Sequence, residues 1–161
     1  MGCFVYADEA LEADDIIASI ASQYQDSMER IDIVSNDKDL YQLLGANIAM
    51  RIQKKGLEPN AIFDQAALET SLGLKPHQIP DLKGLMGDAS DNLPGVPGVG
   101  EKTAVKLLST YGTLEGIYEN INDIKGKLKE RLIENQEAAF TYRHLAKLIP
   151  DASLPFSIED L

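Results

Sequence analysis

Apolar residues recur at helical spacing near the start of the chain. Within residues 12–24, the side chains of Ile16, Ile17, Ile20 and Tyr24 fall on one face of a helix. The acidic residues at the beginning of this stretch suit a helix N-terminus, where the helix dipole favours carboxylates. The pattern therefore predicts an amphipathic helix over residues 12–24.

The spacing then changes to that of strands. Residues 31–35 (IDIVS) are rich in β-branched side chains and predict a short strand, while residues 46–53 (ANIAMRIQ) alternate loosely and predict a second. Between them, NDKDLYQLLG predicts a turn and a short helix closed by Gly45, and a further turn is expected at residues 54–56. Up to about residue 55 the sequence thus predicts an α/β portion, a partial parallel sheet with helices.

Helical periodicity dominates the rest of the chain, and the last dozen residues read as a loop or tail. The expected helical segments are residues 63–73, residues 74–87 with proline breaks, residues 101–112, a helix that starts near Thr113, and one or two helices within residues 123–148. We therefore expect two parts, an α/β part over residues 1–55 and an all-helical part over residues 56–161.

Composition and charge limit the function. The formal net charge is −11, so a protein that grips DNA with its whole surface is disfavoured, and any nucleic-acid site has to be local. No apolar run has the length of a membrane span, and the N-terminus lacks the basic and apolar pattern of a signal peptide. The single cysteine excludes an internal disulfide, and we expect a cytoplasmic protein in a bacterial or phage-like nucleoid context.

Seven carboxylates fall in three short groups, each at the end of an expected element: Glu12, Asp14 and Asp15; Asp37 and Asp39; Asp88 and Asp91. Each group also has an ordinary explanation, namely helix-dipole complementation, turn chemistry and capping. Together they suggest a site for hard divalent cations such as Mg²⁺ or Mn²⁺, which prefer oxygen ligands. Two such ions can clamp both oxygens of a phosphodiester displacement.

Two other metal or phosphate chemistries are disfavoured. His77 and His144 have no partner pattern that suggests zinc, and a surface or packing role explains each of them. No Gly-Lys-Ser/Thr phosphate loop is present in the sequence, which argues against nucleotide hydrolysis of that kind.

A glycine-rich turn follows the last acidic pair and leads into a helix. Gly95, Gly98 and Gly100 allow a close backbone approach and positive φ, and the helix that begins near Glu101 points its free N–H groups at the turn. Lys102 and Lys106 add positive charge on one helical face, and Val96 and Val99 can pack inward and hold the turn. The pattern predicts contacts to a sugar-phosphate backbone, although a plain helix–turn–helix connection remains the alternative.

A second basic group lies further along the chain, at Lys125, Lys127, Lys129 and Arg131. It could extend a path for DNA away from the glycine turn. A solvated helical face explains the same charges, and both interpretations stay open.

Three stretches resemble a known family. EADD at 12–15, SNDKDLYQL at 35–43 and GDASDNLPGVPGVGEKTAVKLL at 87–108 are similar, in this order, to the 5′-nuclease domain of bacterial DNA polymerase I and the related flap endonucleases. The resemblance runs from about Leu11 to at least Tyr142. Its last stretch is the most specific, because it joins paired acids, a glycine hairpin and a lysine-bearing helix. In the family this is a helix–three-turn–helix module, which resembles a helix-hairpin-helix and would span residues 84–112 here.

The resemblance implies roles for individual residues. Glu12, Asp14 and Asp15 would bind the tighter of two divalent ions, directly or through water, while Asp37, Asp39, Asp88 and Asp91 would serve the second. Backbone carbonyls around Val96 and Val99 would hold a monovalent ion, often potassium, against a DNA phosphate. The expected DNA contacts are Gly95, Val96, Gly98, Val99, Gly100, Lys102, Thr103 and Lys106.

The chain also departs from the family pattern. Family members begin with a strand that carries an aspartate in a pattern like LIDG, then add a second aspartate and a basic helical arch, and this sequence has none of these. We therefore expect the C-terminal half of a 5′-nuclease domain, incomplete for catalysis by itself, with the N-terminal half on the same gene or on another chain. Whether a polymerase domain follows Leu161 stays open.

Three functions fit these features. The first is the metal- and DNA-binding half of a structure-specific 5′-3′ exonuclease or flap endonuclease, which acts on duplex or branched DNA by two-metal hydrolysis. The second is a non-catalytic helix-hairpin-helix module that binds the DNA backbone and uses its acids only structurally. The third, a metal-dependent phosphatase of small substrates, leaves the glycine hairpin unexplained.

Overall fold

The computed structural model describes residues 4–53, 61–157 and 159, which fold into two compact units. Unit 1 comprises Met1–Ile62 and Leu148–Leu161, and unit 2 comprises Phe63–Lys147. The boundary predicted at residues 55 and 56 and the turn predicted at 54–56 lie outside the described residues. None of the described helices combines the length and the apolar character that a membrane crossing requires.

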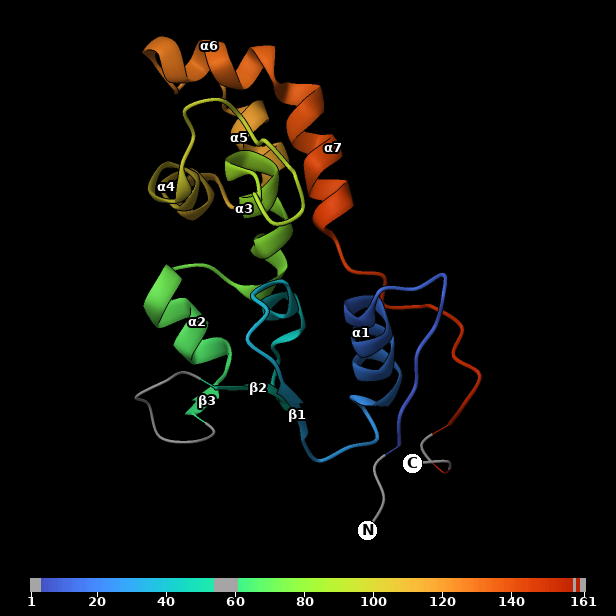
Figure 1. The fold of residues 1–161 in the computed structure, drawn as a ribbon. Helices are drawn as coiled ribbons and strands as arrows, with labels where there is room; N and C mark the ends of the chain where they lie inside the picture. The colour runs from blue at the N-terminus through green and yellow to red at the C-terminus, as the bar shows by residue number, and fades with distance from the viewer. Residues whose placement is uncertain (1–3, 54–60, 158, 160–161) are drawn as a thin grey trace. The chain divides into compact units, whose positions relative to one another are not determined.

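Unit 1 contains a helix and a small sheet (Figure 1). In chain order its elements are α1 (Ala13–Tyr24), β1 (Ile31–Val34), the 3₁₀ turn η1 (Asp39–Leu43) and β2 (Ile48–Ile52). β1 and β2 pair in parallel, with Ile31 opposite Ile48. The predicted helix, both predicted strands and the α/β character of this part are confirmed.

A third strand was not predicted from the sequence. β3 (Ala61–Phe63) completes a sheet of order β1-β2-β3. It is only three residues long, which is too short for an alternating pattern to stand out from the neighbouring chain.

Burial in α1 differs in part from the predicted apolar face, because Tyr24 is buried whereas Ile16, Ile17 and Ile20 are only half-buried. Ala18, Ala21 and Tyr24 form the buried face of α1, and α1 packs against η1. Leu40 of η1 and Met50 of β2 are fully buried. This core holds the start of α1 and the loop after β1 in fixed positions, and both segments carry acidic groups singled out in the sequence.

Unit 2 is mostly helical (Figure 1). Its elements are α2 (Gln65–Leu72), the 3₁₀ turn η2 (Pro76–Gln78), α3 (Ile79–Met86), α4 (Glu101–Tyr111), α5 (Leu114–Glu119), α6 (Gly126–Glu134) and α7 (Gln136–Ala146). The all-helical part predicted over residues 56–161 is confirmed in part, because strand β3 lies within that range. The segment at 123–148 forms two helices rather than one, because Asn135 leaves the helical conformation at φ −114° and ends α6.

Helix α3 is the centre of unit 2 and packs against α4 and α7. Its Asp81 is buried, and its carboxylate accepts a hydrogen bond from the Leu114 amide at 2.9 Å. The same carboxylate pairs with Arg143 of α7 at 3.4 Å, and Arg143 also bonds Glu115. One buried carboxylate therefore connects α3, α5 and α7.

The crossing of α3 and α7 is close because α3 carries a glycine there. A Cβ at Gly84 would lie 2.7 Å from the carbonyl oxygen of Ala139 and 2.9 Å from Cβ of Arg143. Contacts this short oblige the two helices to move apart.

Gly84→Ala tests this packing. Alanine favours a helix over glycine by about 1 kcal/mol, but overpacking of this kind costs roughly 1–3 kcal/mol, so we expect a net loss of unfolding free energy. The measurement is urea unfolding followed by circular dichroism. Gly45→Ala is the control, since its Cβ would meet only one atom within 4 Å, at 3.9 Å. Equal stability of both variants and the wild type would contradict the packing argument.

Candidate functional site

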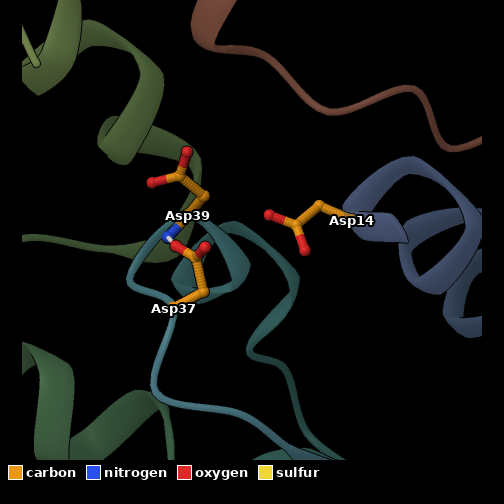
Figure 2. Close-up of side chains that lie close together, drawn as sticks. All are labelled: Asp14, Asp37 and Asp39. Atoms are coloured by element: carbon orange, nitrogen blue, oxygen red, sulfur yellow. Dashed lines mark hydrogen bonds between the residues drawn. The ribbon is translucent and has the colours of Figure 1, made fainter. Parts of the chain in front are cut away.

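Three carboxylates converge in unit 1. Asp14 lies in the first turn of α1, whereas Asp37 and Asp39 belong to the loop after β1 and to the start of η1. Each offers an oxygen, and these oxygens all lie within 4.8 Å of one another. Figure 2 shows the side chain of Asp14 pointing across toward the other two. Residues more than twenty positions apart thus form one acidic group.

A local turn after β1 positions the carboxylates of Asp37 and Asp39. The Asp39 amide donates to the Asp37 carboxylate at 3.0 Å, and the Asp37 amide donates to the Ser35 hydroxyl at 3.0 Å. This is the turn chemistry that the Asn36-Asp37 pair suggested. The turn and the acidic group coexist, because one carboxylate oxygen serves the turn while Asp14 approaches from α1.

The acidic group is electrostatically strained. Burial raises the pKa of the Asp14 carboxyl above its ordinary value, and the negative charges of Asp37 and Asp39 raise it further. A cation placed among the three oxygens would relieve this repulsion. A hard divalent ion fits the donor set, which consists only of carboxylate oxygens.

Glu12 and Asp15, the two other acids of the first sequence group, are not part of the cluster formed by Asp14, Asp37 and Asp39. Glu12 is the N-cap residue of α1 and is exposed, and its side chain makes no capping hydrogen bond. Asp15 accepts a hydrogen bond from the Ile149 amide at 2.9 Å, so it secures the C-terminal segment of unit 1. Asp14 is therefore the member of the first group that faces the loop acids directly.

The third acidic group, Asp88 and Asp91 of unit 2, lies beside a buried lysine. Lys83 of α3 is 7% exposed, and its ammonium group lies 2.6 Å from Asp88 and 3.5 Å from Asp91. Asp88 also accepts hydrogen bonds from the amide and the hydroxyl of Ser90. Partial burial raises the pKa of Asp88, but the hydrogen bonds from Lys83 and Ser90 outweigh it and hold that pKa at about 2.

Lys83 was not predicted as a site residue, although one feature of the sequence could have indicated it. It interrupts IPDLKGLM, an otherwise largely apolar helical run, five residues before Asp88. A charged residue within a buried helix needs a partner of opposite charge, and two candidate site residues, Asp88 and Asp91, follow it by five and eight positions.

The glycine turn after Asp91 uses its three glycines differently. A Cβ on Gly95 would collide with the backbone of Met86 and Gly87, so Gly95 serves the fold. Gly98 has a φ of +76°, which favours glycine. Gly100 has a φ of −94° and open space around the position of a Cβ. Of the three, Gly100 presents free space to a ligand.

Two buried valines hold the glycine turn in place. Val96 and Val99 are 2% and 4% exposed. The Val96 amide donates to the Leu85 carbonyl at 2.8 Å, and the Val96 carbonyl accepts from the Val99 amide at 3.0 Å. The predicted inward packing of both valines is confirmed.

Several backbone amides at the glycine turn are free hydrogen-bond donors. Within the described chain, the amides of Gly98, Gly100, Glu101 and Lys102 donate no hydrogen bond. The side chains of Lys102 and Lys106 on α4 are exposed, and Thr103 is half-buried. These donors and charges provide what an anionic backbone requires.

Two family models match the chain. The N-terminal resolvase-like domain of 5′-3′ exonucleases matches residues 1–73, and their C-terminal SAM fold matches residues 74–161. The resemblance is therefore broader than the C-terminal half that the sequence motifs indicated.

Curated relatives support the same family. DNA polymerase I of Bacillus caldotenax is 45% identical over 157 residues, which cover 97% of this chain and 18% of the relative. DNA polymerase I of Streptococcus pneumoniae strain R6 is 46% identical over 162 residues, covering 100% of this chain and 18% of the relative. The chain thus spans less than a fifth of the length of these relatives.

Solved structures share the fold. A T5 5′-exonuclease with bound zinc superposes with a TM-score of 0.77 at 23% identity, over 90% of this chain and 52% of that chain. The catalytic core of Rad2 in complex with DNA superposes with a TM-score of 0.57 at 18% identity, over 89% of this chain and 50% of that chain. With both domain models matched in sequence order, the chain belongs to the 5′-3′ exonuclease family.

Proposed function

We propose that this chain is the metal- and DNA-binding part of a structure-specific 5′-3′ exonuclease or flap endonuclease that hydrolyses phosphodiester bonds with two divalent cations. The observation that carries the proposal is the convergence of Asp14, Asp37 and Asp39 within 4.8 Å in a member of this family. Related proteins support it, since T5 5′-exonuclease has been solved with divalent zinc and the T5 flap endonuclease with DNA and metal ions.

Asp14, Asp37 and Asp39 would hold one divalent ion, such as Mg²⁺ or Mn²⁺. Bound ions of this kind supply Lewis acidity toward a phosphate and neutralise the charge that develops on its oxygens. Glu12 and the second carboxylate oxygen of Asp15 would add ligands from α1, directly or through water. The raised pKa of Asp14 supports this assignment, because burial and the negative charges of Asp37 and Asp39 disfavour its ionised form, which a bound cation would stabilise.

Asp88 and Asp91 would serve the second ion, with Lys83 beside them. Lys83 already supplies one positive charge to this pair. We propose that Lys83 keeps the pair ionised and ordered in the absence of metal, because its ammonium group lies within 3.5 Å of both carboxylates.

The glycine turn and α4 would bind the sugar-phosphate backbone without reading sequence. The proposed contacts are Gly95, Val96, Gly98, Val99, Gly100, Lys102, Thr103 and Lys106. The free amides at Gly98, Gly100, Glu101 and Lys102 support this assignment, and Val96 and Val99 keep the turn rigid from within. A potassium ion at the valine carbonyls stays a prediction of the family resemblance.

The alternative function is a non-catalytic DNA-binding module that retains the turn. This module would make the same DNA contacts, but its acidic groups would bind no metal ion. Metal binding in the absence of DNA therefore separates the two functions.

The DNA contact is tested by Gly100→Val. Valine fits the folded turn, because Gly100 has an ordinary φ and open space around it, but its side chain would stand where a phosphate approaches. We expect duplex and 5′-flap DNA to bind at least about fivefold more weakly, with little change in melting temperature, as a single phosphate contact predicts. Fluorescence anisotropy at low salt measures the affinity.

The control for this prediction is Ser109→Val. It introduces the same side chain at an exposed position near the other end of α4. Equal DNA affinity of Gly100→Val, Ser109→Val and the wild type would remove the turn from the DNA site.

The metal site is tested by thermal unfolding with and without Mn²⁺. An ion at ten times its Kd stabilises the folded state by about 1.4 kcal/mol, which corresponds to a few degrees for a domain of this size. Asp37→Asn is expected to reduce this gain and to raise the melting temperature slightly without metal, because one repelling charge is lost. Asp26→Asn, an exposed acid of unit 1, should keep the full gain. No gain for the wild type at millimolar Mn²⁺ would favour the non-catalytic module.

The pairing of Asp88 with Lys83 predicts a pH dependence of stability in metal-free buffer. The folded pKa of about 2 lies below the ordinary value of 3.8, so the pairing stabilises the fold above pH 4 by about 2 kcal/mol and is lost as the pH falls toward 2. Asp88→Asn should remove this contribution at pH 7 and flatten the unfolding free energy between pH 4 and 2. Urea unfolding at a series of pH values measures it.

Asp123→Asn provides the comparison, since it removes the same charge from an exposed position of unit 2. If Asp88→Asn is as stable as Asp123→Asn across the pH range, the ion pair contributes nothing to folding.

A further inference from the structure

Arg131 of α6 lies against the glycine turn, although 33 positions separate it from Gly98. The space that a Cβ on Gly98 would need is occupied by the Arg131 guanidinium, with its Nη1 nearest and its Cζ 3.0 Å from the Cβ position. Both residues belong to unit 2. The turn therefore has an arginine beside it that the 84–112 stretch does not contain.

The guanidinium of Arg131 has no acidic partner. Its side chain is exposed and makes neither a hydrogen bond nor an ion pair with any residue in the described part of the chain. The other three arginines are paired: Arg30 and Arg51 with Asp32, and Arg143 with Asp81 and Glu115. In a chain of net charge −11 with 26 acidic residues, an arginine left unpaired beside a turn is the exception.

The groups around Arg131 favour an anion. The amides of Gly98 and Gly100 donate no hydrogen bond in the described chain, and the exposed Lys102 follows Gly100 by two residues in α4. A guanidinium presents two parallel N–H donors, which match the two oxygens of a phosphate. A phosphate bound at the turn would therefore meet both the Arg131 guanidinium and free backbone amides.

We propose that Arg131 is a DNA-phosphate contact, so that the DNA site of this protein includes α6 as well as the turn and α4. The inference rests on the proposed DNA-binding function. It also gives Arg131 a role different from that of Lys129 in the second basic group, because the Lys129 ammonium donates to Asn122. Gly98 then has two tasks: it adopts a positive φ, and it leaves room for the guanidinium.

Lys129 supplies a matched control on the same helix. It lies two residues before Arg131, so the two side chains point to different faces of α6. The Lys129 ammonium donates to Asn122 at 2.8 Å. Lys129→Gln and Arg131→Gln change the net charge equally, and the comparison isolates the position of the charge.

The experiment measures the affinity of the 161-residue chain for a fluorescent duplex by anisotropy at several salt concentrations. Arg131→Gln is expected to weaken binding roughly fivefold at low salt and to lower the slope of log K against log salt by about 1, as the loss of one phosphate contact predicts. Lys129→Gln should leave the slope unchanged. Arg131→Lys should restore the slope but only part of the affinity, because it keeps the charge and loses the paired donors.

Gly98→Ala adds a coupling test. Its Cβ would displace the guanidinium, so Gly98→Ala and Arg131→Gln combined should lose less affinity than the sum of the two single changes. Strict additivity would count against a shared contact.

The outcomes separate this inference from the proposed function. If Arg131→Gln equals Lys129→Gln in affinity and slope while Gly100→Val binds weakly, the turn binds DNA and Arg131 takes no part. If Arg131→Lys recovers neither slope nor affinity and melts lower, Arg131 is structural and the inference is overturned. If the wild type fails to bind duplex or flap DNA, the proposed function and the inference both fail.

Discussion

The charge of a buried lysine is the constraint on which the loop after α3 depends. Lys83 is only 7% exposed, and an ammonium group in that position requires compensation. The chain supplies it by turning back after Gly87, so that Asp88 and Asp91 reach the lysine. The same reversal pairs Asp88 with Leu93 through two backbone hydrogen bonds. The glycine turn is thereby carried onto α3, where the Val96 amide bonds Leu85.

The pKa values of the carboxylates are shifted in opposite directions in the two units. In unit 1, burial and neighbouring acids raise the pKa of Asp14, which leaves a site that gains from a cation. In unit 2, partial burial raises the pKa of Asp88, but Lys83 and Ser90 lower it by more. Carboxylates with the same sequence signature thus have different electrostatic states. In unit 2 the lowering comes from Lys83 and Ser90, both of which lie outside the acidic groups singled out in the sequence.

Much of the fold followed from local sequence. The spacing of Ile16, Ile20 and Tyr24 predicted α1, and Gly73 correctly marked the end of α2, where it adopts φ +73°. The number of helices after residue 123 stayed open because no glycine or proline separates α6 from α7. Asn135 makes the break, and its preference for a non-helical conformation is too weak to read without the packing of both helices.

The sequence by itself determined most of the secondary structure, the three acidic groups, the inward valines of the turn and the family resemblance, because each is encoded within a few neighbouring residues. Only the tertiary structure decided which groups meet. It brought Asp14 to Asp37 and Asp39, assigned Asp15 to the Ile149 amide, and set Arg131 against Gly98. Such contacts join residues tens of positions apart, and they depend on how helices and strands pack, which hydrophobic periodicity does not specify.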